Sequence, residues 1–127
     1  RPPQRPRLSV ALWLFIAAGA LVQASHAGVY AFGSLHWRAL GYDKPAIAWF
    51  WIIGVICEIG LFWVLSRRMA SGVAGGLGIV VGCAAAVVRF GGLALDPGPA
   101  ATLALQALHA VSFGVSHLGM MAVLGAL

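Results

Sequence analysis

The sequence predicts an all-α membrane protein with four transmembrane helices. Of its 127 residues, 61% are hydrophobic and 9% are charged, whereas about 25% of residues are charged in an average soluble domain. Four apolar stretches each reach the roughly 20 residues that a helix needs to cross a bilayer. They cover residues 8–32, 46–65, 72–95 and 101–127. No strand-like alternation interrupts them, and a helix satisfies its own backbone in lipid.

The basic residues predict the orientation of these spans. A net charge of +5 would suggest nucleic acid as the partner of a soluble protein, but here Arg and Lys lie mainly at the ends of the apolar stretches. The arginines before the first span and after the second are Arg1, Arg5, Arg7, Arg67 and Arg68. With four spans these two groups share one side, which positive charge marks as cytoplasmic. Residues 1–7 are therefore predicted to be a cytoplasmic linker, and nucleic acid is not expected as a partner.

The first span carries polar residues at helical spacing. Gln23, His26, Tyr30 and Ser34 fall within an arc of about 80° on one helix face. We expect this face to form one wall of a polar cavity. The alternative is a helix contact without a ligand, because buried polar groups also hold membrane helices together. A secretory signal peptide with a cleavage site at residues 25–27 fits less well, since the polar spacing continues through the apolar run.

The second and third spans each contain one charged residue. Glu58 lies near the middle of its span, where a carboxylate costs several kcal/mol unless it is protonated, paired or hydrated. The alternative is a static ion pair that only fixes packing. Arg89 lies nearer the outer end of its span, where it either reaches the headgroups or turns inward to pair with Glu58 or bind a substrate carboxylate. The preceding small residues, including the Gly78 and Gly82 pair, predict close approach by another helix.

The fourth span carries the widest polar stripe. Its members lie within an arc of about 140°, and they are Gln106, His109, Ser112, Ser116 and His117. Such groups in a membrane helix normally face a bundle interior or a watery cavity. The two histidines lie about 12 Å apart along the helix and about 80° apart around it, so we expect different roles. Histidine titrates near neutral pH, and His109 is the candidate for the substrate or proton site, while His117 would hydrate or gate the inner exit.

These features resemble the start of the C-terminal half of the phenylpropionate permease group, in the major facilitator superfamily. The matching residues are Gln23-x-Ser25-His26-Ala27 with Tyr30, then Glu58, then Arg89 followed by an aromatic, then Gln106, His109, Phe113 and His117 with Leu118. The resemblance implies helices seven to ten of a twelve-helix carrier. Residues 8–127 would then be a four-helix fragment of the C-terminal half. Its partners would be the N-terminal half and the remaining helices, in a bacterial inner membrane.

The resemblance also implies a function. The protein would be a secondary active transporter and not an enzyme, and it would work by proton-coupled symport of a small organic solute such as an aromatic acid. Related symporters use an acidic residue, an arginine and histidines of this half for proton coupling or substrate binding. The predicted residues are Gln23, His26, Tyr30, Glu58, Arg89, Gln106, His109 and His117. No metal or cofactor is expected, since Cys57 and Cys83 lie inside spans, where small packing residues are common.

Two other classes of protein fit parts of the pattern. A small four-helix multidrug exporter has this length, but its glutamate is expected in the first span, where His26 lies. A haem-binding membrane subunit would use His26 with His109 or His117 as axial ligands. That arrangement leaves Glu58 and Arg89 without a role, and a Soret band in the purified protein would identify it.

Overall fold

The computed structural model describes residues 9–65, 68 and 72–126, and all the spans within them are helical. They are α1 (Val10–Ala39), α2 (Lys44–Leu65), α3 (Gly72–Leu93) and a fourth span made of α4 (Pro99–Ala107), the π-helical segment η1 (Ala110–Val115) and α5 (Ser116–Gly125). Within this described part of the chain, four helices are long and apolar enough to cross a membrane, the fourth being the whole of Pro99–Gly125. The predicted all-α membrane fold is confirmed, whereas the predicted linker at residues 1–7 lies outside the described residues.

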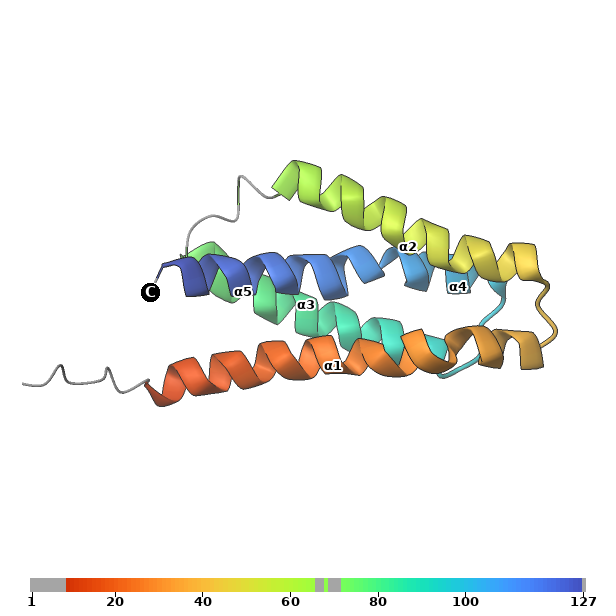
Figure 1. The fold of residues 1–127 in the computed structure, drawn as a ribbon, viewed down its shortest axis with the longest axis horizontal. Coiled ribbons are helices and arrows are strands. Elements are labelled where there is room, and N and C mark those ends of the chain that lie inside the picture. Colours follow the sequence, from red (N-terminus) through yellow and green to blue (C-terminus); the bar gives the residue numbers. More distant parts are fainter. Residues whose placement is uncertain (1–8, 66–67, 69–71, 127) are drawn as a thin grey trace, which may run out of the picture.

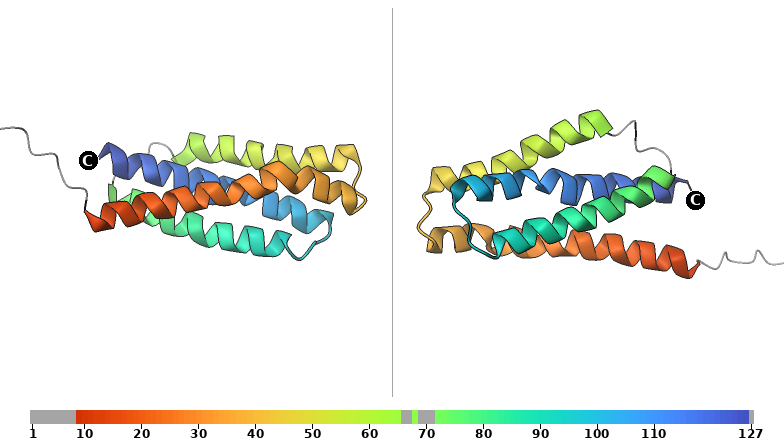
Figure 2. Two further views of the ribbon diagram at one scale, coloured as in Figure 1. Left: turned by 60° about the horizontal axis from the view of Figure 1, so that its bottom comes forward. Right: turned by 180° about the vertical axis from the view of Figure 1, so that it is seen from behind.

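The four spans run alternately up and down, as Figure 1 shows. The fourth span is central, because α4, η1 and α5 lie between α2 and α3 in Figure 2. α3 packs along η1 and α5, and α2 packs along α4 and η1. α1 contacts each of the three remaining spans, but less extensively. The span with the widest polar stripe is therefore the one that most of the bundle packs against.

The first helix is longer than the sequence predicts. It continues to Ala39, beyond the apolar stretch that ends at residue 32 and beyond Ser34, the last residue placed on the predicted helix face. Polar residues in its last turns have partners on α2, since Trp51 Nε1 donates a hydrogen bond to Ser34 Oγ at 2.9 Å. The chain turns only at Gly41, whose φ of +90° is one that glycine adopts without strain.

An aromatic cluster fixes the hairpin between α1 and α2. Trp37, Ile47 and Phe50 are buried together, and the Trp37 and Phe50 rings lie 5.1 Å apart, edge to face. Tyr42, in the connecting turn, adds a second edge-to-face contact with Phe50 at 5.2 Å. Aromatic pairs of this geometry stabilise packing beyond their buried area. The cluster thereby sets the register of α2, on which the candidate site depends.

Small residues bring α3 and α5 into backbone contact. A Cβ atom on Gly82 would lie 2.6 Å from Ser116 Cβ, and one on Gly75 would lie 2.7 Å from the Gly119 carbonyl oxygen. Gly78 is buried in the same contact, where a Cβ on Gly119 would lie 3.4 Å from its carbonyl carbon. The predicted close approach of a helix to this glycine face is therefore confirmed.

Adjacent glycines of α3 provide a matched test of this packing. Gly75→Ala is expected to lower the free energy of unfolding by about 1–3 kcal/mol, because the new methyl group meets backbone that cannot adopt another rotamer. Gly76→Ala is expected to be neutral or slightly stabilising, since nothing lies within 4 Å of its Cβ position and alanine favours helix. Thermal unfolding of the purified full-length protein in detergent measures both. Equal melting temperatures for the two variants would contradict the packing described here.

The fourth span is not the continuous α-helix that the stretch 101–127 predicts. The carbonyl of Leu108 accepts hydrogen bonds from the amides three and four residues ahead, at 3.1 and 3.0 Å, and η1 follows. Ser112 Oγ donates to the His109 carbonyl at 3.3 Å, and Ser116 Oγ donates to the Ser112 carbonyl at 2.8 Å. Serine hydroxyls that bond to the preceding turn compete with the helical backbone pattern. Single π-helical turns of this kind are frequent at functional sites.

The π-helical segment changes which residues share the buried face. A π-helix has wider turns than an α-helix, so residues after η1 do not follow the predicted α-helical register. Gln106, His109, Ser112 and Ser116 are buried, but His117 is exposed. His117 is therefore not buried with the other members of the stripe in the part of the chain that the structure describes, and its place in the predicted site stays a prediction.

Candidate functional site

The polar faces of α1 and of the fourth span meet each other. Their contacts follow an antiparallel register: Gln23 Nε2 to Ser116 Oγ at 3.4 Å, His26 Nε2 to Ser112 Oγ at 3.2 Å, and Tyr30 OH to His109 Nε2 at 3.2 Å. Each step is three or four residues along both helices, which keeps successive contacts on one face. The two faces that the sequence predicts separately thus form one interface.

His109 lies where α1, α2 and the fourth span converge. Its Nε2 atom is 3.2 Å from Tyr30 OH and 3.3 Å from Glu58 Oε2. Its Nδ1 atom is buried without a hydrogen-bond partner among the described residues. The Glu58 side chain keeps 18% of its surface exposed. An imidazole and a carboxylate within contact distance can share or exchange a proton.

Arg89 turns inward from α3 and is 1% exposed, so it does not reach the headgroups. Its Nη2 atom donates to Gln106 Oε1 at 2.7 Å, and Gln106 Nε2 donates in turn to the Phe50 carbonyl at 3.0 Å. The guanidinium also lies 5.1 Å from the centre of the Phe90 ring. Its Nε and Nη1 atoms are buried without a hydrogen-bond partner in the part of the chain that the structure describes. A buried charge with unsatisfied donors is costly unless an anion or water completes it.

A small cavity of about 90 Å³ joins these groups. It is lined by Tyr30, Trp51, Gly54, Val55, Glu58, Arg89, Gln106 and His109. One water needs about 10–15 Å³ by this measure, so the cavity has room for several waters or for a carboxylate group. Within the described residues, Glu58 and Arg89 form no ion pair; they line one cavity, and Glu58 contacts His109.

The remaining predicted residues lie at different distances from this cavity. His26 is 1% exposed and sits beside it, with its ring 5.3 Å from that of His109. Gln23 is farther along the α1 interface, and its Oε1 atom is buried without a partner among the described residues. His117 stacks on Phe113 at 6.1 Å but does not line the cavity.

Sequence reasoning missed part of the α2 wall. Trp51, Gly54 and Val55 line the cavity together with Glu58. They precede Glu58 by seven, four and three residues, which places all four on one helix face. This spacing in the sequence could have identified them as neighbours of Glu58. Gly54 also lets α2 approach closely, since a Cβ there would lie 3.1 Å from the Gln106 carbonyl oxygen.

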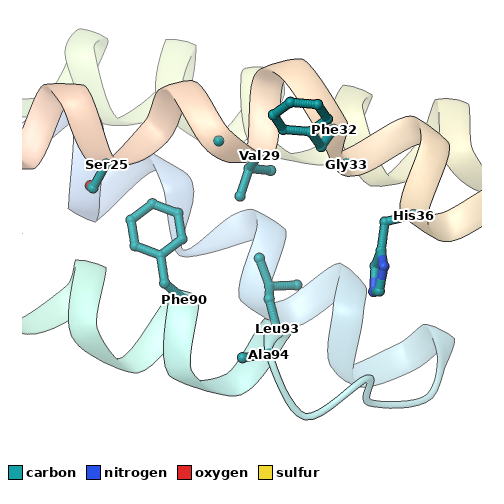
Figure 3. A pocket seen from close by; sticks show the side chains of 9 residues that line it. Ser25, Val29, Phe32, Gly33, His36, Phe90, Leu93 and Ala94 are labelled. Atoms are coloured by element: carbon teal, nitrogen blue, oxygen red, sulfur yellow. The ribbon is translucent and has the colours of Figure 1, made fainter.

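A larger and mostly apolar groove of about 540 Å³ lies between α1 and α3 (Figure 3). Phe32, Phe90 and Leu93 contribute much of its lining, and His36 stands at one end. His36 Nε2 lies 2.6 Å from Asp96 Oδ1, and both side chains are about half exposed. The groove holds no residue of the predicted site, so the small polar cavity is the candidate site.

Membrane-spanning helices that bury ionisable side chains between them are typical of membrane transport proteins. The family model described as the MFS_1 like family matches residues 8–125. The chain therefore belongs to this family of the major facilitator superfamily and forms part of a larger bundle, as the sequence predicts. This assignment indicates a transport protein rather than an enzyme, and it favours a carrier over a small multidrug exporter or a haem-binding subunit.

One curated relative is the probable 3-phenylpropionic acid transporter of Escherichia coli (strain K12). The two sequences are 30% identical over 109 residues, which are 86% of this chain and 28% of that protein. The chain thus spans less than a third of the relative's length. No solved structure gives a significant match. The predicted resemblance to the phenylpropionate permease group is confirmed.

Proposed function

We propose that this chain forms helices seven to ten of a proton-coupled symporter for a small organic carboxylate, such as an aromatic acid, in a bacterial inner membrane. The observation that carries the proposal is the buried guanidinium of Arg89. Two of its nitrogens have no partner among the described residues, and it lines a cavity shared with Glu58 and His109. A carboxylate accepts two parallel hydrogen bonds from adjacent guanidinium nitrogens, and here either Nε or Nη1 can donate one together with the second hydrogen of Nη2, whose first hydrogen goes to Gln106. The relative from Escherichia coli is named for 3-phenylpropionic acid, whose ionised form is such a carboxylate.

The contact between Glu58 and His109 supplies the proton site in this proposal. The two side chains are 3.3 Å apart and line the cavity that contains the Arg89 guanidinium. A substrate carboxylate bound there brings negative charge close to the pair. Electrostatic attraction then favours the proton-loaded pair when substrate is present, because the local dielectric is low. Substrate and proton would bind together, which is the requirement for symport.

The rest of the carrier would complete the site. In transporters of this kind the substrate lies near the middle of the bilayer, between two repeated halves. Tyr30 and the exposed part of Glu58 would face the N-terminal half. The arginines at positions 1 to 7 and 67 to 68 favour a cytoplasmic location for the start of this fragment. His117, outside the cavity, would then lie toward the inner exit.

Transport by the full-length protein in proteoliposomes tests this function. We expect 3-phenylpropionate to accumulate when the lumen is made alkaline and to leak out when a protonophore collapses the pH gradient. The neutral amide of the same compound is the matched control, since it has the same shape and no charge to bind Arg89. It should neither accumulate nor compete. Accumulation that survives the protonophore would contradict proton coupling, and equal competition by the amide would contradict carboxylate recognition.

A further inference from the structure

His26 is a buried imidazole that the proposed mechanism does not use. Its Nδ1 atom lies 2.8 Å from the Val22 carbonyl oxygen. A carbonyl only accepts hydrogen bonds, so Nδ1 must carry the hydrogen. The protonation state of the ring therefore depends on Nε2 alone, and Nε2 lies 3.2 Å from Ser112 Oγ.

Ser112 can serve His26 in both of its protonation states. Its hydroxyl oxygen is fully buried, 3.2 Å from His26 Nε2 and 3.3 Å from the His109 carbonyl oxygen. When His26 is neutral, the hydroxyl donates its single hydrogen to Nε2. When His26 is charged, Nε2 donates to the hydroxyl oxygen, which then donates to the His109 carbonyl. Both arrangements use the same positions of the heavy atoms, and His26 Nε2 keeps a partner in each, so the buried ring avoids the free-energy cost of an unpaired nitrogen.

We infer that His26 is a second proton-carrying residue of the carrier and that Ser112 transmits its protonation state to the backbone of His109. The inference rests on the proposed proton coupling. The proton adds to the lone pair of Nε2, and no covalent bond breaks. The added hydrogen bond reaches the carbonyl of the residue directly before η1. His26 is thus a positioning residue for the imidazole that contacts Glu58.

Titratable or charged groups lie near His26 on its own helix, on α3 and on the fourth span, beside the Phe90 and Phe113 rings that pack against it. Tyr30 lies on the same helix, with its ring 6.3 Å away. Arg89 of α3 interacts with it electrostatically, and His109 packs against it from the fourth span. Glu58 of α2 is linked to it through His109. A proton on His26 therefore acts directly on the groups that line the cavity.

Nitrogen NMR of the full-length protein, labelled with ¹⁵N-histidine, tests the inference without any substrate. The His26 signal is assigned by its loss in His26→Gln, or in His26→Asn if the first variant misfolds. We expect Nδ1 to stay protonated while Nε2 gains a proton as the pH falls from about 9 to about 4. Ser112→Ala should move the midpoint toward acid by about one pH unit, since the hydrogen bond to the charged ring is the stronger one. Ser116→Ala, which removes the next buried hydroxyl of the same face, should leave it unchanged.

The inference is overturned if Nε2 stays in one state over this range, or if Ser112→Ala and Ser116→Ala have equal effects. Counterflow exchange of 3-phenylpropionate against pH gives an independent measurement. A positioning role predicts that Ser112→Ala shifts this pH profile by the same amount as the NMR midpoint. Parent-like profiles for Ser112→Ala and His26→Gln, in a protein that transports, would refute the inference and leave the proposed function standing. Failure of the parent protein to transport 3-phenylpropionate would refute the proposed function, while the NMR titration would still decide the state of His26.

Discussion

Replacing Arg89 with glutamine is expected to reduce counterflow exchange of 3-phenylpropionate by the full-length protein about 100-fold or more. Two charge-assisted hydrogen bonds to a carboxylate contribute at least about 3 kcal/mol together, and that energy corresponds to a factor of about 100 in affinity. Arg89→Lys should lose about tenfold, because an ammonium keeps the charge but cannot donate two parallel hydrogen bonds. Exchange measured at several substrate concentrations separates weaker binding from slower turnover.

The control for this prediction is Arg38→Gln. It makes the same chemical change at an exposed position near the end of α1, where no effect on exchange is expected. Should Arg89→Gln exchange substrate like the parent, the guanidinium does not bind the carboxylate. If Arg89→Gln and Arg89→Lys reduce counterflow exchange equally, positive charge alone cannot explain the role of Arg89. A packing function for Arg89 would then be the better account.

Glu58→Gln is expected to abolish uphill accumulation of 3-phenylpropionate while preserving counterflow exchange near the parent rate. The glutamine side chain has nearly the same shape and still accepts a hydrogen bond, but it cannot take up or release a proton in the working pH range. Counterflow requires no net proton movement, so it should continue. The comparison of accumulation ratio with exchange rate in the same vesicles measures this difference.

Asp96→Asn is the matched control, because it neutralises the other carboxylate that contacts a histidine. That pair, with His36, is about half exposed and lies away from the polar cavity. Accumulation should remain as in the parent. Full accumulation by Glu58→Gln would place proton coupling elsewhere in the carrier. Equal loss of accumulation and exchange would make Glu58 a substrate-binding residue.

The sequence predicts the four spans because their length and hydropathy depend on local composition. It does not predict η1, since that segment depends on where the hydroxyls of Ser112 and Ser116 find acceptors. Hydrophobic periodicity carries no signal for such a change. The sequence places Ser34 on the helix face of the first span, but the last turns of α1 lie beyond the apolar stretch. Their partners on other elements, such as Trp51 for Ser34, cannot be predicted from one helix.

The two polar helix faces of the candidate site could be predicted from the sequence, but the individual side-chain contacts between helices could not. Helical spacing alone places Gln106 and His109 on one face. Which side chains meet across helices depends on the register between them, and no single-helix pattern contains it. The structure therefore does not show the hypothetical direct contact between Glu58 and Arg89. Instead, Glu58 contacts His109, and Arg89 donates a separate hydrogen bond to Gln106. Functional coupling of Glu58 and Arg89 through the shared cavity stays a prediction, which the double variant can test for additivity.

The backbone contact between α3 and α5 has a mechanical consequence. Where Gly75 lies against Gly119, the two helices touch without intervening side chains, so no rotamer change can absorb relative movement there. On the α1 side of the fourth span, long side chains such as Gln23 and Tyr30 bridge the helices through hydrogen bonds of 3.2–3.4 Å, and these can be exchanged one at a time. Packed interfaces resist continuous deformation, whereas hydrogen-bonded ones rearrange in steps. The fourth span is therefore held rigidly against α3 and less rigidly against α1, and we expect any relative sliding of helices to be concentrated on the α1 side.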